Sequence, residues 1–130
     1  MATNTIHPPA GKAPDQPPPD IETMRETADR LLDPDAASDI LPPTVAEVDT
    51  LTRTMRGQLE LLIPDIKRLV GGRPKNIAQY CALACVGEAR RKLSIEPGPG
   101  LDAGTAFARR LARVLNALCD HYERLSEAAS

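Results

Sequence analysis

Apolar residues recur at steps of three and four along several stretches of the chain, a spacing that predicts α-helices. One such stripe spans residues 45–69, a second spans 107–125, and a shorter one predicts a helix over 21–32. Together with the stretch 77–93, they make three long helices and a short N-terminal one. Because these steps are typical of packed helices, the sequence predicts an all-α helical bundle.

The stretch 77–93, IAQYCALACVGEARRKL, has apolar residues on nearly every side of its first three helical turns. A helix that is apolar nearly all round is normally buried. Its many small side chains would also let neighbouring backbones come close. We therefore expect this helix to lie at the centre of the bundle, with the other helices packed around it.

Capping residues mark where two of the helices begin. Asp20 is a good N-cap for the first helix, and Thr44 with Glu47 forms a capping box for the second. Pro64 falls inside the second helical pattern, where it removes one backbone donor. We expect the second helix to be kinked near Pro64 or broken into two helices, with Gly71 ending it.

The remaining boundaries follow from prolines and glycines. The third helix is expected to be entered at Pro74 and to end before the breaker 96–100, EPGPG. The fourth is expected to run from Asp102 or Thr105 to Leu125, with residues 127–130 frayed. Residues 33–43 are predicted to form a loop.

Residues 1–19 contain six prolines and almost no bulky apolar residues, so they are predicted to be a disordered tail. This leaves a single helical domain over residues 20–126. We interpret the tail as an inert segment, with docking to a partner as the alternative.

Composition excludes several classes of function. The formal net charge is −2, and aromatic residues make up only 2% of the chain, so neither charge nor base stacking favours nucleic acid. No apolar run is long enough to cross a membrane, and the N-terminus lacks the apolar region of a signal peptide. The three cysteines form no disulfide framework. These features predict a cytoplasmic protein.

Few residues of this chain are suited to metal binding or to nucleophilic catalysis. Cys81 and Cys85 lie one turn apart, but Cys119 and His121 are two residues apart on one helix and point in opposite directions. A single zinc ion therefore does not fit the four residues. We interpret His121 as an ordinary surface residue near a helix end. The alternative is that His121 pairs with a cysteine for catalysis. We expect no catalytic residue, no metal and no cofactor.

Glu88 is the one acidic residue on the otherwise apolar face of the central stretch. A carboxylate there must be paired, hydrogen-bonded or in contact with solvent. The favoured interpretation is a structural ion pair with Arg91, with Lys92 or with an arginine from another helix. The alternative is a ligand site between the third and fourth helices, lined by Glu88, Tyr80, Arg91 and Arg110.

The basic residues 90–92, with Arg109, Arg110 and Arg113, raise DNA binding as a further alternative. No short helix–turn–helix spacing accompanies them, because the connections between the predicted helices are long and proline-rich. Nucleic-acid binding is therefore not favoured.

Four segments carry a resemblance to a known group of proteins: LELLIPDIKRLV, YCALACVGEARRKL, PGPG and ARRLARVLNALCDHYE. They resemble a family of small actinobacterial proteins of unknown molecular function that are labelled natural-product-biosynthesis proteins. The resemblance implies an actinobacterial, cytoplasmic origin. It implies no catalytic or binding residues.

From these observations we expect a non-catalytic accessory or interaction protein with a protein partner, associated with natural product biosynthesis or its regulation. The alternatives are a small-molecule-binding protein or minor enzyme with a site around Glu88, and a DNA-binding regulator. Self-association is a further expectation, since Leu61, Ile63 and Val70 lie beside the long stripe of the second helix, where they would be exposed.

Overall fold

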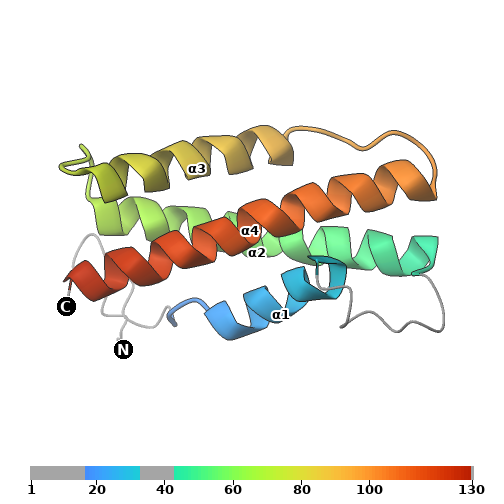
Figure 1. The fold of residues 1–130 in the computed structure, drawn as a ribbon, viewed down its shortest axis with the longest axis horizontal. Coiled ribbons are helices and arrows are strands. Elements are labelled where there is room, and N and C mark those ends of the chain that lie inside the picture. The colour runs from blue at the N-terminus through green and yellow to red at the C-terminus, as the bar shows by residue number, and fades with distance from the viewer. Residues whose placement is uncertain (1–16, 33–42, 130) are drawn as a thin grey trace, which may run out of the picture.

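The structure, a computed structural model, describes residues 17–32 and 43–129. Within these ranges all regular secondary structure is α-helical, and the all-α bundle expected from the sequence is confirmed (Figure 1). The helices are α1 (Ile21–Leu32), α2 (Val45–Val70), α3 (Ile77–Leu93) and α4 (Leu101–Ala129). None of these described helices has the length and apolar composition needed to cross a membrane.

The predicted helix caps of α1 and α2 are present. The backbone N–H of Thr23 donates to the Asp20 carboxylate at 3.0 Å. Thr44 and Glu47 form the reciprocal capping box, each side chain accepting from the other residue's backbone N–H. Gly71 ends α2 in the left-handed conformation with φ of 77°, which a residue without a Cβ adopts at low cost.

Other boundaries differ from the expectation. α3 begins at Ile77 rather than at Pro74, because the Asn76 side chain accepts the backbone N–H of Gln79 at 2.9 Å and caps the helix there. α4 begins at Leu101 and runs to Ala129, so residues 127–129 continue the helix instead of fraying. The predicted tail up to residue 16, the loop 33–42 and residue 130 lie outside the described residues.

Pro64 does not divide α2 into two helices. The helix runs unbroken from Val45 to Val70, so the predicted break is wrong, while a kink stays a prediction. Buried apolar residues lie on both sides of the proline, and packing of this face holds the helix together across the lost hydrogen bond. They are Met55, Leu59, Leu62, Ile63, Ile66 and Val70.

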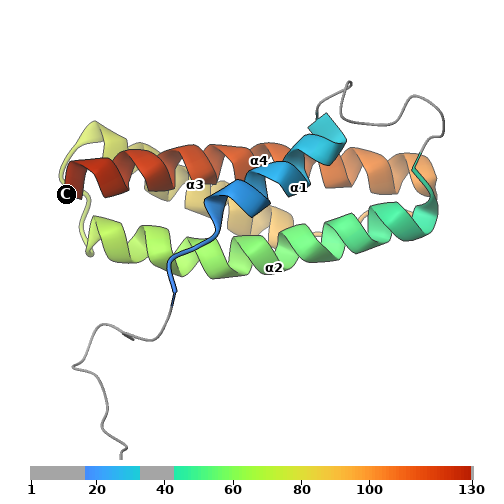
Figure 2. The same ribbon diagram turned by 90° about the horizontal axis from the view of Figure 1, so that it is seen from below.

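The centre of the bundle is α4, and the expectation that residues 77–93 occupy it is wrong. α4 and α2 each contact all three other described helices, whereas α1 and α3 do not contact each other, and both α1 and α3 pack more extensively on α4 than on α2. Helices α2 and α4 run in the same direction as a central pair, with α3 on one flank and α1 on the other (Figures 1 and 2). The residues of α4 that are buried are Phe107, Ala108, Leu111, Ala112, Val114, Leu115, Leu118, Cys119 and Leu125.

Side-chain size explains this order. Hydrophobic stabilisation is proportional to the apolar area removed from water, and leucine removes far more than alanine or cysteine. Burying the leucine-rich stripe of α4 between the other helices therefore stabilises the fold more than burying α3 would. In α3 only Ala82, Val86 and Ala89 are buried.

Polar contacts fix both flanking helices on the central pair. On one flank, Arg25 of α1 forms ion pairs with Asp120 at 2.8 Å and Glu123 at 2.6 Å on α4. On the same flank, the Gln58 side-chain amide of α2 donates to Thr27 Oγ1 of α1 at 3.1 Å. These contacts set the position of α1 along α2 and α4.

On the other flank, Arg56 of α2 holds the end of α3. Its guanidinium donates to the carbonyl of Leu93 at 2.9 Å and to that of Ile95 at 2.7 Å. It also stacks 5.1 Å from the centroid of the Phe107 ring. The carbonyls in the last turn of a helix lack partners within the helix, so Arg56 supplies one from outside.

The side of α2 predicted for self-association is largely covered. Ile63 and Val70 are buried in the core, and only Leu61 is exposed. The part of that prediction that rested on Ile63 and Val70 is wrong, because these side chains point toward the neighbouring helices.

Candidate functional site

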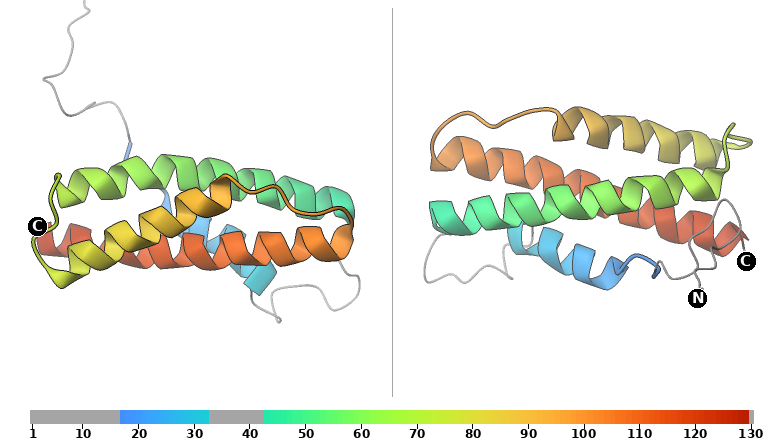
Figure 3. Two further views of the ribbon diagram at one scale, coloured as in Figure 1. Left: turned by 90° about the horizontal axis from the view of Figure 1, so that it is seen from above. Right: turned by 180° about the vertical axis from the view of Figure 1, so that it is seen from behind.

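A groove lies between α3 and α4, and we call it the α3–α4 groove. The left panel of Figure 3 shows α3 crossing the central pair obliquely from α4 toward α2, so α3 and α4 diverge. The groove has a volume of about 530 Å³. Its lining residues are Ala84, Cys85, Glu88 and Lys92 of α3, and Arg110, Arg113, Val114 and Ala117 of α4.

Small side chains create this hollow. Ala84 and Cys85 of α3 face Val114 and Ala117 of α4, and none of the four fills the space that opens between the diverging helices. The same small residues that suggested a buried α3 therefore line an apolar floor instead. Burial raises the pKa of the Cys85 thiol to about 11, with a further rise caused by Glu88, so this thiol is neutral at physiological pH.

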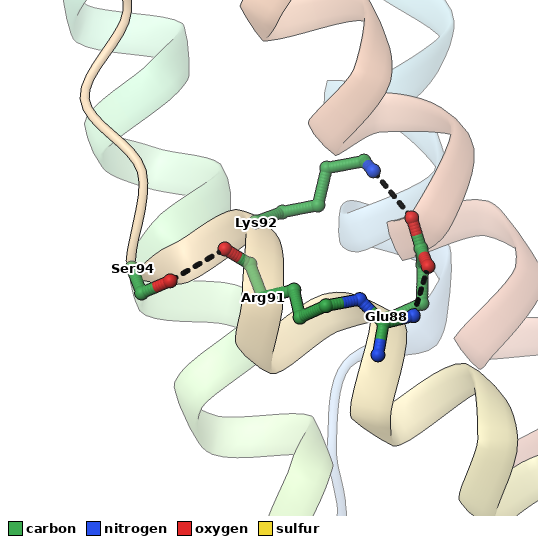
Figure 4. A network of polar contacts seen from close by, with 4 residues as sticks. All are labelled: Glu88, Arg91, Lys92 and Ser94. Atoms are coloured by element: carbon green, nitrogen blue, oxygen red, sulfur yellow. Dashed lines mark hydrogen bonds and ion pairs between the residues drawn. The ribbon is translucent and has the colours of Figure 1, made fainter.

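Glu88 sits at the edge of the groove and is paired within its own helix. Its carboxylate accepts from the Lys92 ammonium and from the Arg91 guanidinium, as Figure 4 shows. The hydrogen bond from Lys92 and then that from Arg91 lower the pKa of Glu88, so the carboxylate is ionised at neutral pH. The predicted structural ion pair is confirmed, but the side chain is 41% exposed rather than enclosed by neighbouring helices.

The four residues of the predicted ligand site are only partly brought together. Glu88 and Arg110 both line the groove. Tyr80 is 61% exposed and lies outside the groove lining, as does Arg91. Lys92 and Arg113 were missed as site residues, although they lie four residues after Glu88 and three after Arg110, a spacing that places each on the same helical face as its predicted neighbour.

The charge on the groove is positive. Three cationic side chains and one carboxylate line it. Glu88 pairs with Lys92, whereas neither Arg110 nor Arg113 has a hydrogen-bond or ion-pair partner among the residues that the structure describes. The two guanidiniums lie one turn apart on α4 and are left with uncompensated charge.

The second surface feature is an apolar stripe on the outer side of α3, which we call the α3 outer face and define as Ile77, Tyr80 and Cys81. All three are exposed, with Ile77 at 79% of its maximum. Their spacing of three and four residues puts them on one side of the helix. Ala84, also exposed, continues the stripe into the α3–α4 groove.

Within the described ranges, no three or more His, Cys, Asp or Glu side chains are placed to hold a metal ion. Burial, and after it the charge of the neighbouring Arg124, lower the pKa of His121. Burial likewise raises the pKa of the Cys119 thiol to about 11. The absence of a metal or cofactor stays a prediction.

The three thiols are expected to differ sharply in reactivity. The thiolate is the reactive form, and at pH 8 a thiol with a pKa of about 11 is only ~0.1% ionised. Iodoacetamide should therefore alkylate the exposed Cys81 first, with Cys85 and Cys119 at least about 10-fold slower. Peptide mass mapping against time measures this order. Equal rates for Cys81 and Cys85 in the folded protein, matching those in guanidinium chloride, would contradict it.

Comparison with known proteins places the chain in a family. No curated protein and no solved structure matches it. The family model described as "Family of unknown function (DUF6415)" matches residues 22–127, from the first turn of α1 almost to the end of α4. Since this match covers most of the sequence and nearly all of the four described helices, the chain belongs to this family of unknown function.

Proposed function

We propose that the protein is a non-catalytic accessory protein that binds a protein partner through the α3 outer face. The observation that carries this proposal is the exposure of Ile77, Tyr80 and Cys81 on one side of a helix whose other side packs on α2 and α4. Exposed apolar residues that form a contiguous stripe mark interaction sites more often than scattered ones.

The make-up of the stripe suits contact with another helix. Tyr80 supplies a large amphipathic ring, the kind of side chain that is enriched in the centre of interfaces. Cys81 and Ala84 are small and exposed, so a partner helix can approach closely beside it. The stripe thus offers a partner the i, i+3, i+4 and i+7 pattern of helix packing.

The non-catalytic part of the proposal is supported by the state of the reactive groups. The pKa values of Cys85 and Cys119 are raised to about 11, which disfavours a thiolate nucleophile. Glu88 is ionised and paired with two cations, so it is a poor proton acceptor. A role in natural product biosynthesis or its regulation, and a cytoplasmic location, rest on the resemblance of the sequence alone.

DNA binding is less well supported. Arg109 donates to the carbonyl of Leu31 in α1 at 3.4 Å, while Arg110 and Arg113 line the groove beside α3. The arginines of α4 therefore serve opposite flanks of the bundle instead of forming one basic face.

The proposal is tested by recovery of a partner from a lysate of the source cells. Ile77→Ser with Tyr80→Ser removes the stripe without touching the core, and we expect it to reduce recovery of a specific partner at least about 10-fold. Leu61→Ser is the matched control, because it removes an apolar side chain of similar exposure from α2. Quantitative mass spectrometry of the captured proteins measures both.

Two outcomes would count against the proposal. Equal loss of the partner in the double variant and in Leu61→Ser would show that general surface hydrophobicity, not the α3 outer face, is recognised. The second outcome is measured by sedimentation velocity. If the purified wild type forms a dimer and the double variant does not, the face binds a second copy of the chain and not a different protein.

A further inference from the structure

We propose that the α3–α4 groove binds a small amphipathic anion, a molecule with an apolar body and one carboxylate, sulfonate or phosphate group. The volume of about 530 Å³ lies within the range of roughly 300–1,000 Å³ that is common for small-molecule sites. This site differs from the α3 outer face in its charged residues and in its occupant, and Ala84 is the residue at which the two surfaces meet.

The anionic group is recognised by Arg110 and Arg113. Both line the groove, both come from one side of α4, and neither is paired within the described part of the chain. A guanidinium presents two parallel N–H donors that match the oxygens of a carboxylate or phosphate. Two such groups one turn apart form a clamp for a single anion.

Glu88 shapes this selectivity by neutralising Lys92. Its carboxylate accepts from the Lys92 ammonium, and its second oxygen accepts from Arg91 outside the groove (Figure 4). The cations of α3 at the groove are therefore partly compensated by a carboxylate, whereas Arg110 and Arg113 on the α4 side have none within the described residues. The anionic group of the ligand is thus expected at α4 and not at α3.

The apolar body of the ligand is accommodated by the floor. Ala84, Cys85, Val114 and Ala117 present methyl groups and a thiol to the hollow. The side chains of Arg110 and Arg113 are both exposed to solvent. Here they border a concave apolar floor, so a molecule that buries this floor gains hydrophobic stabilisation together with the ionic contacts.

Two fluorescent probes with closely similar rings test the proposal on the purified full chain. 1-Anilinonaphthalene-8-sulfonate carries the anion, and N-phenyl-1-naphthylamine lacks it. We expect the sulfonate to bind wild type at least about 10-fold more tightly than the neutral probe, a difference of about 1.4 kcal/mol. Equal affinity for the two probes would overturn the proposal, because the arginines would then contribute nothing.

Variants locate the binding. Arg110→Gln with Arg113→Gln should weaken the sulfonate at least about 10-fold and leave the neutral probe unchanged. Arg90→Gln, which removes an exposed arginine of α3 outside the groove lining, is the matched control and should change neither affinity more than about twofold. Unchanged sulfonate affinity in the double arginine variant would overturn the proposal.

The same titration separates this site from the α3 outer face. Ile77→Ser with Tyr80→Ser should keep wild-type affinity for the sulfonate, even if it loses a protein partner. Loss of sulfonate binding in this variant, with retention in the double arginine variant, would place the probe on the outer face and overturn the groove assignment. Far-UV circular dichroism of every variant confirms that the helices remain.

Discussion

Leu115→Ala is expected to lower the free energy of unfolding by about 2–5 kcal/mol, the usual cost of removing a buried leucine side chain. Leu115 is fully buried on α4, the helix on which both flanking helices pack most extensively, so neighbouring side chains can collapse only partly into the space. Urea denaturation followed by circular dichroism measures the change.

Leu83→Ala is the matched comparison, because it removes the same atoms from α3. Leu83 is only partly buried at the edge of the core, so its loss leaves little cavity and should cost distinctly less than the loss of Leu115. If Leu83→Ala proved as costly as Leu115→Ala, α3 would be as central as its sequence pattern suggests, and the assignment of α4 as the central helix would be wrong.

Arg56→Ala is expected to cost about 2–3 kcal/mol, although arginine is a polar residue outside the apolar stripe of α2. The change removes two charge-assisted hydrogen bonds to the carbonyls of Leu93 and Ile95, and the stacking on Phe107. Hydrogen exchange should show the loss first at the C-terminal turn of α3 and in the connection to α4. Denaturation and exchange together measure it.

Two substitutions make this prediction specific. Arg53→Ala, one turn earlier on α2, removes an exposed arginine whose one ion pair within the described residues is with Asp49, and it should change stability by less than about 0.5 kcal/mol. Arg56→Lys keeps the charge but has no planar fork to span two carbonyls, so it should restore less than half of the loss. Similar stability for Arg53→Ala and Arg56→Ala would show that Arg56 does not hold the end of α3.

The ends of the helices depend on residues close together in the chain, whereas the identity of the central helix depends on how whole helices pack. Asp20, the Thr44–Glu47 box and Gly71 act within a few residues of themselves, so their roles are visible in the sequence and were predicted correctly. The centre of the bundle is a comparison between helices. The pattern of α3 shows that apolar residues lie on nearly every side of its first three turns, but not that α4 gains more by burial.

The candidate site likewise has one part that depends on local spacing and one part that depends on helix packing. Pairing of Glu88 with Arg91 and Lys92 depends only on helical spacing, and it was predicted. The groove depends on the divergence of α3 from α4, which is set by packing along both helices and by Arg56 at the end of α3. No local pattern encodes that angle, so Tyr80 was placed in the site, whereas the three-residue spacing from Arg110 is a local signal that indicates Arg113.

The sequence by itself therefore determined the helices, most of their caps and the ion pairs within them, because these depend on contacts between residues close together in the chain. The tertiary structure alone decided that α4 is central, that α3 exposes an apolar side, and that Arg110 and Arg113 border a hollow. Those outcomes depend on which of several apolar surfaces buries the most area when all four described helices compete for the same core.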